Sequence, residues 1–302
     1  MDLPKVDLDA VLLTAAAGDV IELGPHSYEG SFEVPEGVTL RGGPQTRLIA
    51  KEEDMVVLNL IPAKEEDRPT KVESVTIESG KLAINAEGTG YIEILKASIE
   101  TPTGAGIHLK GVTGKIKESK LAGAIDGPNS DKLMLGETFS SDSVSVIGIA
   151  MVNADVQLEK VDIEGYVGFG AVAYQSNIVW KEGMVRWIVG AGFFNEAGTA
   201  VLEGLTFTEG LQSKDILGKR NGFGIVSSKE ASTDTTSVHI ESMMGMGLVA
   251  YESVSGRHLG LSVIDSSSYG VHIQGKEEDR TVKSGAVQAL SFETLSLVAN
   301  SM

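Results

Sequence analysis

The stretch "GFGAVAYQSN" (168–177) returns three times in altered form, as "GAGFFNEAGT" (190–199), "GFGIVSSKEA" (222–231) and "GMGLVAYESV" (245–254). Each copy begins with Gly-x-Gly, continues with an apolar residue and ends in a mixed polar tail. A single Gly-x-Gly is compatible with a phosphate-binding loop. Four copies at nearly regular intervals instead indicate a repeated structural unit.

Aligning the copies on the second glycine extends this column in both directions, with most intervals between 20 and 23 residues. The column contains Ala83, Gly106, Ala150, Gly170, Gly192, Gly224, Gly247 and Gly270. We interpret the long interval between Gly106 and Ala150 as two periods, with one coil hidden around residues 123–132. A period of this size indicates a solenoid.

Within each repeat, apolar residues alternate with period two, which predicts strands rather than helices. The side chains predicted to point into the core are Phe169, Phe193, Ile225 and Leu248. The glycines are predicted to lie where each coil bends into its first strand, because a side chain there would crowd the neighbouring coil. Two or three short strands per period predict a β-solenoid.

The two ends of such a solenoid need to be covered, because open ends expose strand edges. The segment "DLDAVLLTAAAG" (7–18) has the apolar spacing of an amphipathic helix, with Asp7 as N-cap and Gly18 as its stop. We expect this helix to cap the first coil. Residues 284–302 are expected to close the other end, so that 1–302 forms one domain whose coils occupy 18–283.

The segment "GDVIELGPHSYEGSFEVPEGVTLRGG" (18–43) resembles the first coil of the right-handed parallel β-helix proteins of the pectin-lyase-like superfamily. The resemblance extends to about residue 298. It implies an all-β, right-handed parallel β-helix of about eleven coils with a short N-terminal capping helix. It says little about chemistry, because the superfamily contains lyases, hydrolases, epimerases, esterases, adhesins and scaffolds.

The resemblance also implies an extracytoplasmic location: secreted, periplasmic or at the cell surface of a bacterium. The opening "MDLPKVDLDA" lacks the basic and apolar regions of a signal peptide. Either the protein stays inside the cell or a signal was removed before this segment, and the resemblance favours removal.

The composition excludes several classes of function. With 25 Lys and Arg against 42 Asp and Glu, the net charge of −17 disfavours nucleic acids and anionic lipid surfaces. No cysteine is present, which excludes disulfides and thiolate metal sites. The longest apolar run, "MVVLNLIPA" (55–63), is far shorter than the roughly 20 residues that span a bilayer.

The chain lacks the motifs that the enzymes of the superfamily carry. It has neither the Arg-x-Pro-x-x-Arg segment of pectate lyases nor any Asp-Asp pair of the kind that polygalacturonase-like hydrolases use. We therefore expect a non-catalytic scaffold or binding module. The alternative is a carbohydrate-active enzyme acting on an acidic polysaccharide, a polysaccharide lyase rather than a glycoside hydrolase.

Two insertions, 123–145 and 209–221, interrupt the repeat, and long loops on solenoids often build sites. The second insertion carries weak catalytic candidates for a lyase: Lys214, Asp215, Lys219 and Arg220. These residues equally suit a plain surface loop. The first insertion carries weak candidates for binding Ca²⁺ as a cofactor: Asp126, Asn129 and Asp131.

One outward row of the predicted strands is unusually apolar, and it contains His108, Val152, Val172, Phe194, Val226, Val249 and His272. This row is either strand surface under a neighbouring loop or a contact face for a polysaccharide or protein partner. In the next outward row, tyrosines beside a carboxylate could stack on sugar rings. The candidate binding residues are Tyr174, Phe194, Glu196 and Tyr251.

Two features of the same region are less specific. His108 and His272 are too far apart along the solenoid to share a metal ion. Trp180 and Trp187 are compatible with either a core position or a binding platform.

Overall fold

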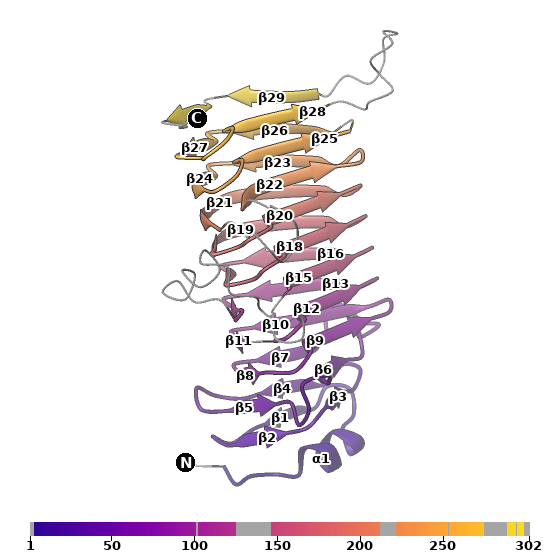
Figure 1. Ribbon diagram of the computed structural model, residues 1–302. Coiled ribbons are helices and arrows are strands. Elements are labelled where there is room, and N and C mark those ends of the chain that lie inside the picture. The colour runs from indigo at the N-terminus through magenta and orange to yellow at the C-terminus, as the bar shows by residue number, and fades with distance from the viewer. Residues whose placement is uncertain are drawn as a thin grey trace.

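The computed structural model describes residues 3–100, 102–124, 146–211, 222–252, 254–274, 289–293 and 295–298. These residues form a right-handed parallel β-helix in which strands stack coil upon coil from one end of the molecule to the other (Figure 1). All pairings between the named strands are parallel, as in β1 with β4 and β25 with β28. The fold class predicted from the repeat is confirmed.

One wall of the helix is a ten-stranded sheet, called sheet B. It receives one strand from each coil, and its order follows the chain without exception. Its strands are β3 (Phe32–Val34), β6 (Val56–Leu60), β9 (Leu82–Glu87), β12 (Ala105–Lys110), β15 (Ile147–Val152), β18 (Phe169–Tyr174), β20 (Ala191–Glu196), β22 (Phe223–Ser228), β25 (Leu248–Tyr251) and β28 (Val271–Gln274).

The other two walls form a continuous twenty-stranded sheet, called sheet A. Its first row contains β1 (Val20–Glu22), β4 (Thr39–Arg41), β7 (Thr70–Glu73), β10 (Tyr91–Leu95), β13 (Thr113–Lys117), β16 (Asp155–Glu159), β23 (Ser232–Thr236), β26 (Ser255–Leu259) and β29 (Ala289–Glu293). Its second row contains β2 (Ser27–Glu29), β5 (Arg47–Ile49), β8 (Thr76–Glu78), β11 (Ser98–Glu100), β14 (Lys120–Ala122), β17 (Asp162–Glu164), β24 (His239–Met243), β27 (Ser262–Ile264) and β30 (Ser296–Val298). Two longer strands, β19 (Asn177–Arg186) and β21 (Thr199–Gly210), run through both rows.

The N-terminal end is capped by helix α1 (Leu8–Thr14), as the sequence predicts. Its N-cap is Asp7, whose carboxylate accepts a hydrogen bond from the Ala10 amide at 3.2 Å. Leu8 and Leu12 are buried, and the helix packs against β3, the first strand of sheet B. The helix ends at Thr14, one turn before the predicted stop at Gly18, because Ala15 already has extended backbone angles.

The bend between the two rows of sheet A is made by one residue with left-handed backbone angles in successive coils. The residues are Ser74, Lys96, Glu118, Lys160, Glu182, Gly204, Ser237 and Gly260, with φ between 50° and 63°. A single left-handed residue turns an extended chain sharply without a long loop. The two glycines take this conformation at little steric cost, whereas the other members are strained.

The glycines of the Gly-x-Gly copies form a stack with a different physical cause. A Cβ placed on Gly170 would lie 2.5 Å from the carbonyl oxygen of Gly192, and one on Gly224 would lie 2.6 Å from that of Gly247. These glycines are therefore required by the close approach of consecutive coils. The expected crowding between coils is confirmed.

The register corrects two features of the predicted alignment. Strand β12 pairs directly with β15, so no coil is hidden between them, and residues 125–145 lie outside the described part of the chain. The pair Ala105–Ile147 places Gly148, not Ala150, in the glycine column. The insertion concealed this register, because it removed the regular interval on which the alignment depended.

The prediction is also wrong about the direction in which one residue, Phe169, points. Phe193, Ile225 and Leu248 are buried as predicted, but Phe169 lies on the outside of sheet B, only partly buried. Gly170 and Ala171 are consecutive and both buried, so the two-residue alternation is interrupted at the glycine. The middle residue of the Gly-x-Gly segment therefore points outward. Ala191 and Phe223 are the middle residues of the next two copies, and they also lie on the outside of sheet B.

Candidate functional site

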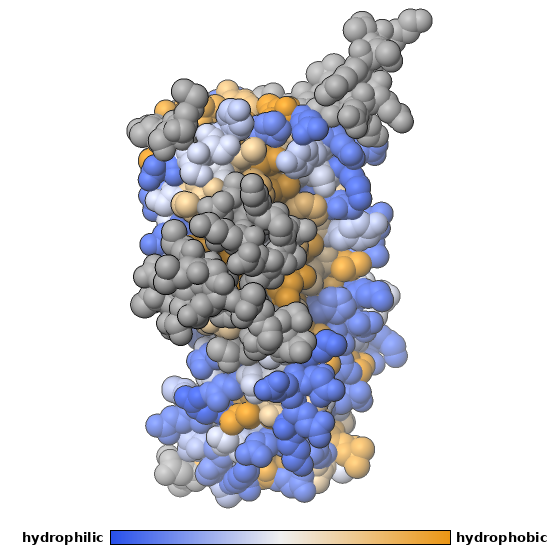
Figure 2. Space-filling model, in the orientation of Figure 1, coloured by the Kyte–Doolittle hydropathy of each residue, from blue (hydrophilic) through white to orange (hydrophobic). Residues whose placement is uncertain are grey.

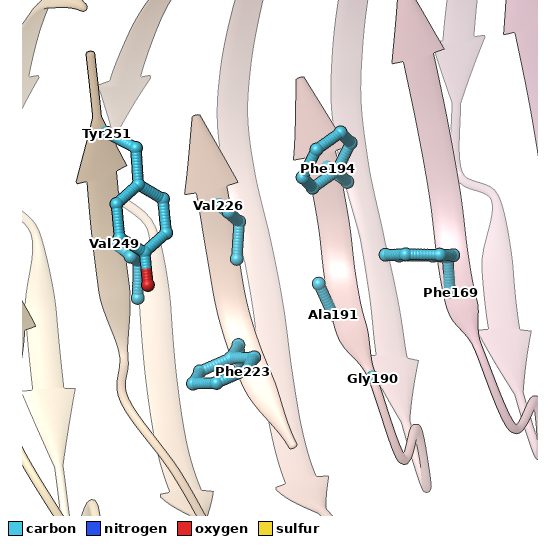
Figure 3. A pocket seen from close by; sticks show the side chains of 8 residues that line it. All are labelled: Phe169, Gly190, Ala191, Phe194, Phe223, Val226, Val249 and Tyr251. Carbon is cyan, nitrogen blue, oxygen red and sulfur yellow. The ribbon is translucent and has the colours of Figure 1, made fainter. Parts of the chain in front are cut away.

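An apolar groove with a volume of about 440 Å³ lies on the outer face of sheet B. Its lining comes from β18, β20, β22 and β25 together with the turn before β20 (Figure 3). The lining residues are Phe169, Gly190, Ala191, Phe194, Phe223, Val226, Val249 and Tyr251. This volume lies within the range of roughly 300–1,000 Å³ that is usual for ligand pockets.

Two outward rows of sheet B supply the groove. The first contains Phe169, Ala191 and Phe223, which pair in register across consecutive strands. The second contains Phe194, Val226 and Val249, which also pair in register. The predicted apolar strip is thus present, but the first row was missed, because the sequence alignment placed it inside the core.

One member of the predicted strip is corrected by the register. His108 pairs with Ala150, and Ala150 with Val172, so Ala150 rather than Val152 belongs to the strip. Val152 lies in the next outward row, beside Tyr174.

Aromatic rings form the walls of the groove. The rings of Phe169 and Phe194 lie 5.5 Å apart with their planes tilted by 55°. Beyond Tyr251, the ring of His272 contacts Tyr251 and Tyr269 at centroid distances of 6.1 and 6.0 Å. The row of aromatic rings therefore continues from β25 to β28. Orange residues are visible in the upper half of Figure 2.

The second outward row, which contains Phe194, is polar in its N-terminal half. His108 contacts the Asn85 side-chain oxygen at 2.9 Å, Asn85 donates to Asn59 at 3.0 Å, and Asn59 donates to Glu33 at 3.4 Å. Because a carboxamide oxygen can only accept, the Nδ1 of His108 carries the proton. Burial lowers the pKa of His108, which keeps the imidazole neutral at neutral pH.

Of the four candidate binding residues, only Phe194 and Tyr251 line the groove. Tyr174 and Glu196 pair with each other in the neighbouring outward row, and Tyr174 is 40 % exposed. Glu196 accepts a hydrogen bond of 2.6 Å from the ammonium group of Lys229. This hydrogen bond, with the negative charge of Glu196, raises the pKa of Lys229, so the amine stays protonated.

The remaining candidates are placed as follows. Lys214, Asp215, Lys219 and Arg220, and likewise Asp126, Asn129 and Asp131, lie outside the described residues. Trp180 is fully buried in the core, whereas Trp187 lies beneath the guanidinium of Arg186 at 4.0 Å. Within the described part of the chain, no group of three or more His, Asp or Glu side chains is arranged to hold a metal ion.

Among the residues that the structure describes, no helix is long and apolar enough to cross a membrane. The helix α1 is too short to cross a bilayer, and no other described segment qualifies.

The chain matches no protein-family model and no curated protein sequence. Among solved structures, a pectate lyase is similar with a TM-score of 0.63 and 9% sequence identity, covering 98% of this chain and 80% of the lyase. The A-module of a mannuronan C-5 epimerase from Azotobacter vinelandii is similar with a TM-score of 0.48 and 12% identity, covering 97% of this chain and 90% of the module. At such low identity the similarity shows the parallel β-helix fold alone.

Proposed function

We propose that this protein is a non-catalytic β-helix that acts extracytoplasmically, secreted or at the cell surface, as a rigid scaffold and binding module. It binds a polysaccharide or a protein through the groove on sheet B. The observation that carries the proposal is the apolar lining of that groove, where two adjoining outward rows of sheet B are both apolar, in contrast to the polar residues Glu33, Asn59 and Asn85 at the N-terminal end of the second row. A large apolar surface patch of this kind usually marks a binding site.

The chemistry around the groove argues against catalysis. Among its lining residues, the Tyr251 hydroxyl is the one side-chain group that can exchange a proton. In the neighbouring outward row, Glu196 is hydrogen-bonded to Lys229, and the raised pKa of Lys229 makes it a poor general base. A lyase acting here would need an unpaired base and a cation free to neutralise the substrate carboxylate.

A carbohydrate-active enzyme remains the alternative, since the structurally similar pectate lyase and epimerase are named for reactions on polysaccharides. One experiment separates the two functions. The purified protein is incubated with polygalacturonate and with alginate, with Ca²⁺ or with a chelator, and the release of unsaturated uronate ends is followed by ultraviolet absorbance.

We expect no product under any of these conditions. In parallel, a glycan and protein-ligand binding screen is run with the parent and with Phe194→Lys, and we expect binding that this substitution abolishes. Val201→Lys is the matched control, because Val201 is 41 % exposed on sheet A, away from the groove. Enzymatic release of uronate ends would refute the non-catalytic function, whereas binding that survives Phe194→Lys would refute the groove as the site.

A further inference from the structure

The groove on sheet B differs from a typical sugar site in the polar groups that it offers. Its eight lining residues contribute one polar side-chain group, the Tyr251 hydroxyl. The backbone amides and carbonyls of β18, β20 and β22 are already used in the ladders between neighbouring strands. A polyhydroxylated ligand would therefore lose hydrogen bonds to water without regaining them, which is unfavourable.

Large apolar side chains suit the groove better. The walls are the rings of Phe169, Phe194 and Phe223, and the floor between them is the small side chain of Ala191 (Figure 3). Aromatic and branched aliphatic groups bind in such settings because ring edges and faces pack closely against them. Interfaces between proteins concentrate their binding energy in pockets of this kind, filled by an aromatic anchor.

The edge of the groove beside Tyr251 carries an excess of negative charge. Glu196 ends β20, Lys229 and Glu230 follow β22, and Glu252 follows β25. The strand ends at this edge thus carry three carboxylates and one ammonium group, and both Glu196 and Glu252 act on Lys229 electrostatically. The whole chain has a net charge of −17, which adds a long-range attraction for cations.

From the apolar lining and the acidic edge we infer that the groove binds a polypeptide segment in which an aromatic or large aliphatic residue is flanked by lysine or arginine. This inference rests on the proposed binding function and specifies its partner. The anchor fills the space above Ala191, and the flanking cations lie against the acidic edge at Glu252, since Glu196 is already paired with Lys229. Apolar contact supplies the affinity, and the charges supply orientation and a faster association.

The test uses the complete chain and a short fluorescein-labelled peptide that carries a Trp–Leu pair between lysines, followed by fluorescence anisotropy. Two control peptides have the same length: in one the Trp–Leu pair is replaced by serines, and in the other the lysines are replaced by glutamates. We expect the first peptide to bind and the serine control to bind at least about tenfold more weakly, since burial of a single large side chain is sufficient for a difference of that size. The glutamate control should also bind more weakly, because its carboxylates meet an edge of like charge.

Substitution Phe194→Asp separates apolar anchoring from general attraction between opposite charges. It removes a wall of the groove while making the surface more negative, so attraction by charge alone would strengthen binding of the lysine peptide. We expect instead a loss of about tenfold or more. Tyr251→Phe removes the one hydroxyl group of the lining but keeps the ring, so it distinguishes a ligand that depends on that hydroxyl from one held by apolar contact. Val201→Asp on sheet A is the control for added charge.

Several results would overturn the inference. The first is no binding of the anchored peptide. The second is equal binding by the parent and Phe194→Asp.

If an oligogalacturonide binds in a way that Phe194→Asp and Tyr251→Phe both weaken, the partner is a carbohydrate, and the inference fails while the proposed function stands. If Phe194→Asp changes the sedimentation coefficient, a second copy of this chain occupies the groove. If that variant instead loses thermal stability and no ligand binds, the protein covers its own groove, and the inference and the proposed function both fail.

Discussion

The rings of Trp180 and Phe193 meet edge to face inside the β-helix, with their centroids 6.2 Å apart and their planes at 74°. Trp180 belongs to sheet A and Phe193 to sheet B, so this contact joins two walls of the β-helix across the core. Trp180 also meets Phe207 edge to face at 6.3 Å. These three rings fill the interior at the height where the outer face of sheet B carries the groove.

Phe193 and Phe194 are neighbours in the chain on opposite faces of β20, which provides a matched pair of substitutions. Phe193 is fully buried, so Phe193→Ala should lower the free energy of unfolding by roughly 3–5 kcal/mol through lost contacts and a new cavity. Phe194→Ala should cost clearly less, because its ring already faces the open groove. Chemical denaturation of both variants provides the measurement, and equal losses would mean that the facing of β20 is wrong.

The glycine stack predicts a severe steric effect. In Gly170→Ala the new methyl group would lie 2.5 Å from the Gly192 carbonyl oxygen and 2.7 Å from a methyl group of Val185. Overpacking of this kind typically costs 1–3 kcal/mol or more, so the midpoint of thermal unfolding should fall sharply. Gly43→Ala is the control, since no atom lies within 4 Å of its added Cβ, and its midpoint should stay close to that of the parent.

Gly204 isolates the other role of glycine in this fold. Its φ is +63°, and the nearest atom to an added Cβ is 4.0 Å away, so Gly204→Ala tests backbone conformation without crowding. We expect a loss of about 1 kcal/mol, because an L-residue is disfavoured in the left-handed region. Glu182, its partner in the previous coil, has the same conformation at φ 54°. Glu182→Gly should therefore not destabilise, and a loss comparable to that of Gly204→Ala would contradict the argument.

His258 should make stability depend on pH. Its side chain is 1 % exposed, its Nδ1 contacts the Thr235 hydroxyl at 3.0 Å, and its ring stacks on Phe292 at 4.9 Å. Burial lowers the pKa of His258 from 6.5 to about 4, against a smaller opposite effect of Asp234. Between these two values the unfolded chain binds a proton that the folded chain does not bind.

Stability should therefore be unaffected by His258 above about pH 6.5 and should fall as the pH decreases from there towards 4. Unfolding free energies measured between pH 7 and pH 5 should show this slope in the parent and a flatter profile in His258→Gln. His239→Gln is the control, because His239 lies at the surface beside Glu241. The same slope in parent and His258→Gln would show that other groups cause it.

The sequence by itself determined the fold, because its signals are local and repeated. The recurring glycines, the period of 20–23 residues and the alternation within strands all require only near neighbours in the chain or the next coil. The capping helix was similarly determined by Asp7 and the spacing of Leu8 and Leu12. Repetition made these signals strong, because each coil presented the same pattern again.

Only the tertiary structure decided which side chains share a surface. Whether Phe169 points inward or outward depends on the interruption of the alternation at Gly170, and a shift of one residue exchanges the two faces of a strand. The place of Ala150 beside His108 depends on how the chain resumes its register after residues 125–145. The groove exists because side chains more than twenty residues apart in the sequence are brought to adjacent strands by parallel pairing, and no local pattern encodes that proximity.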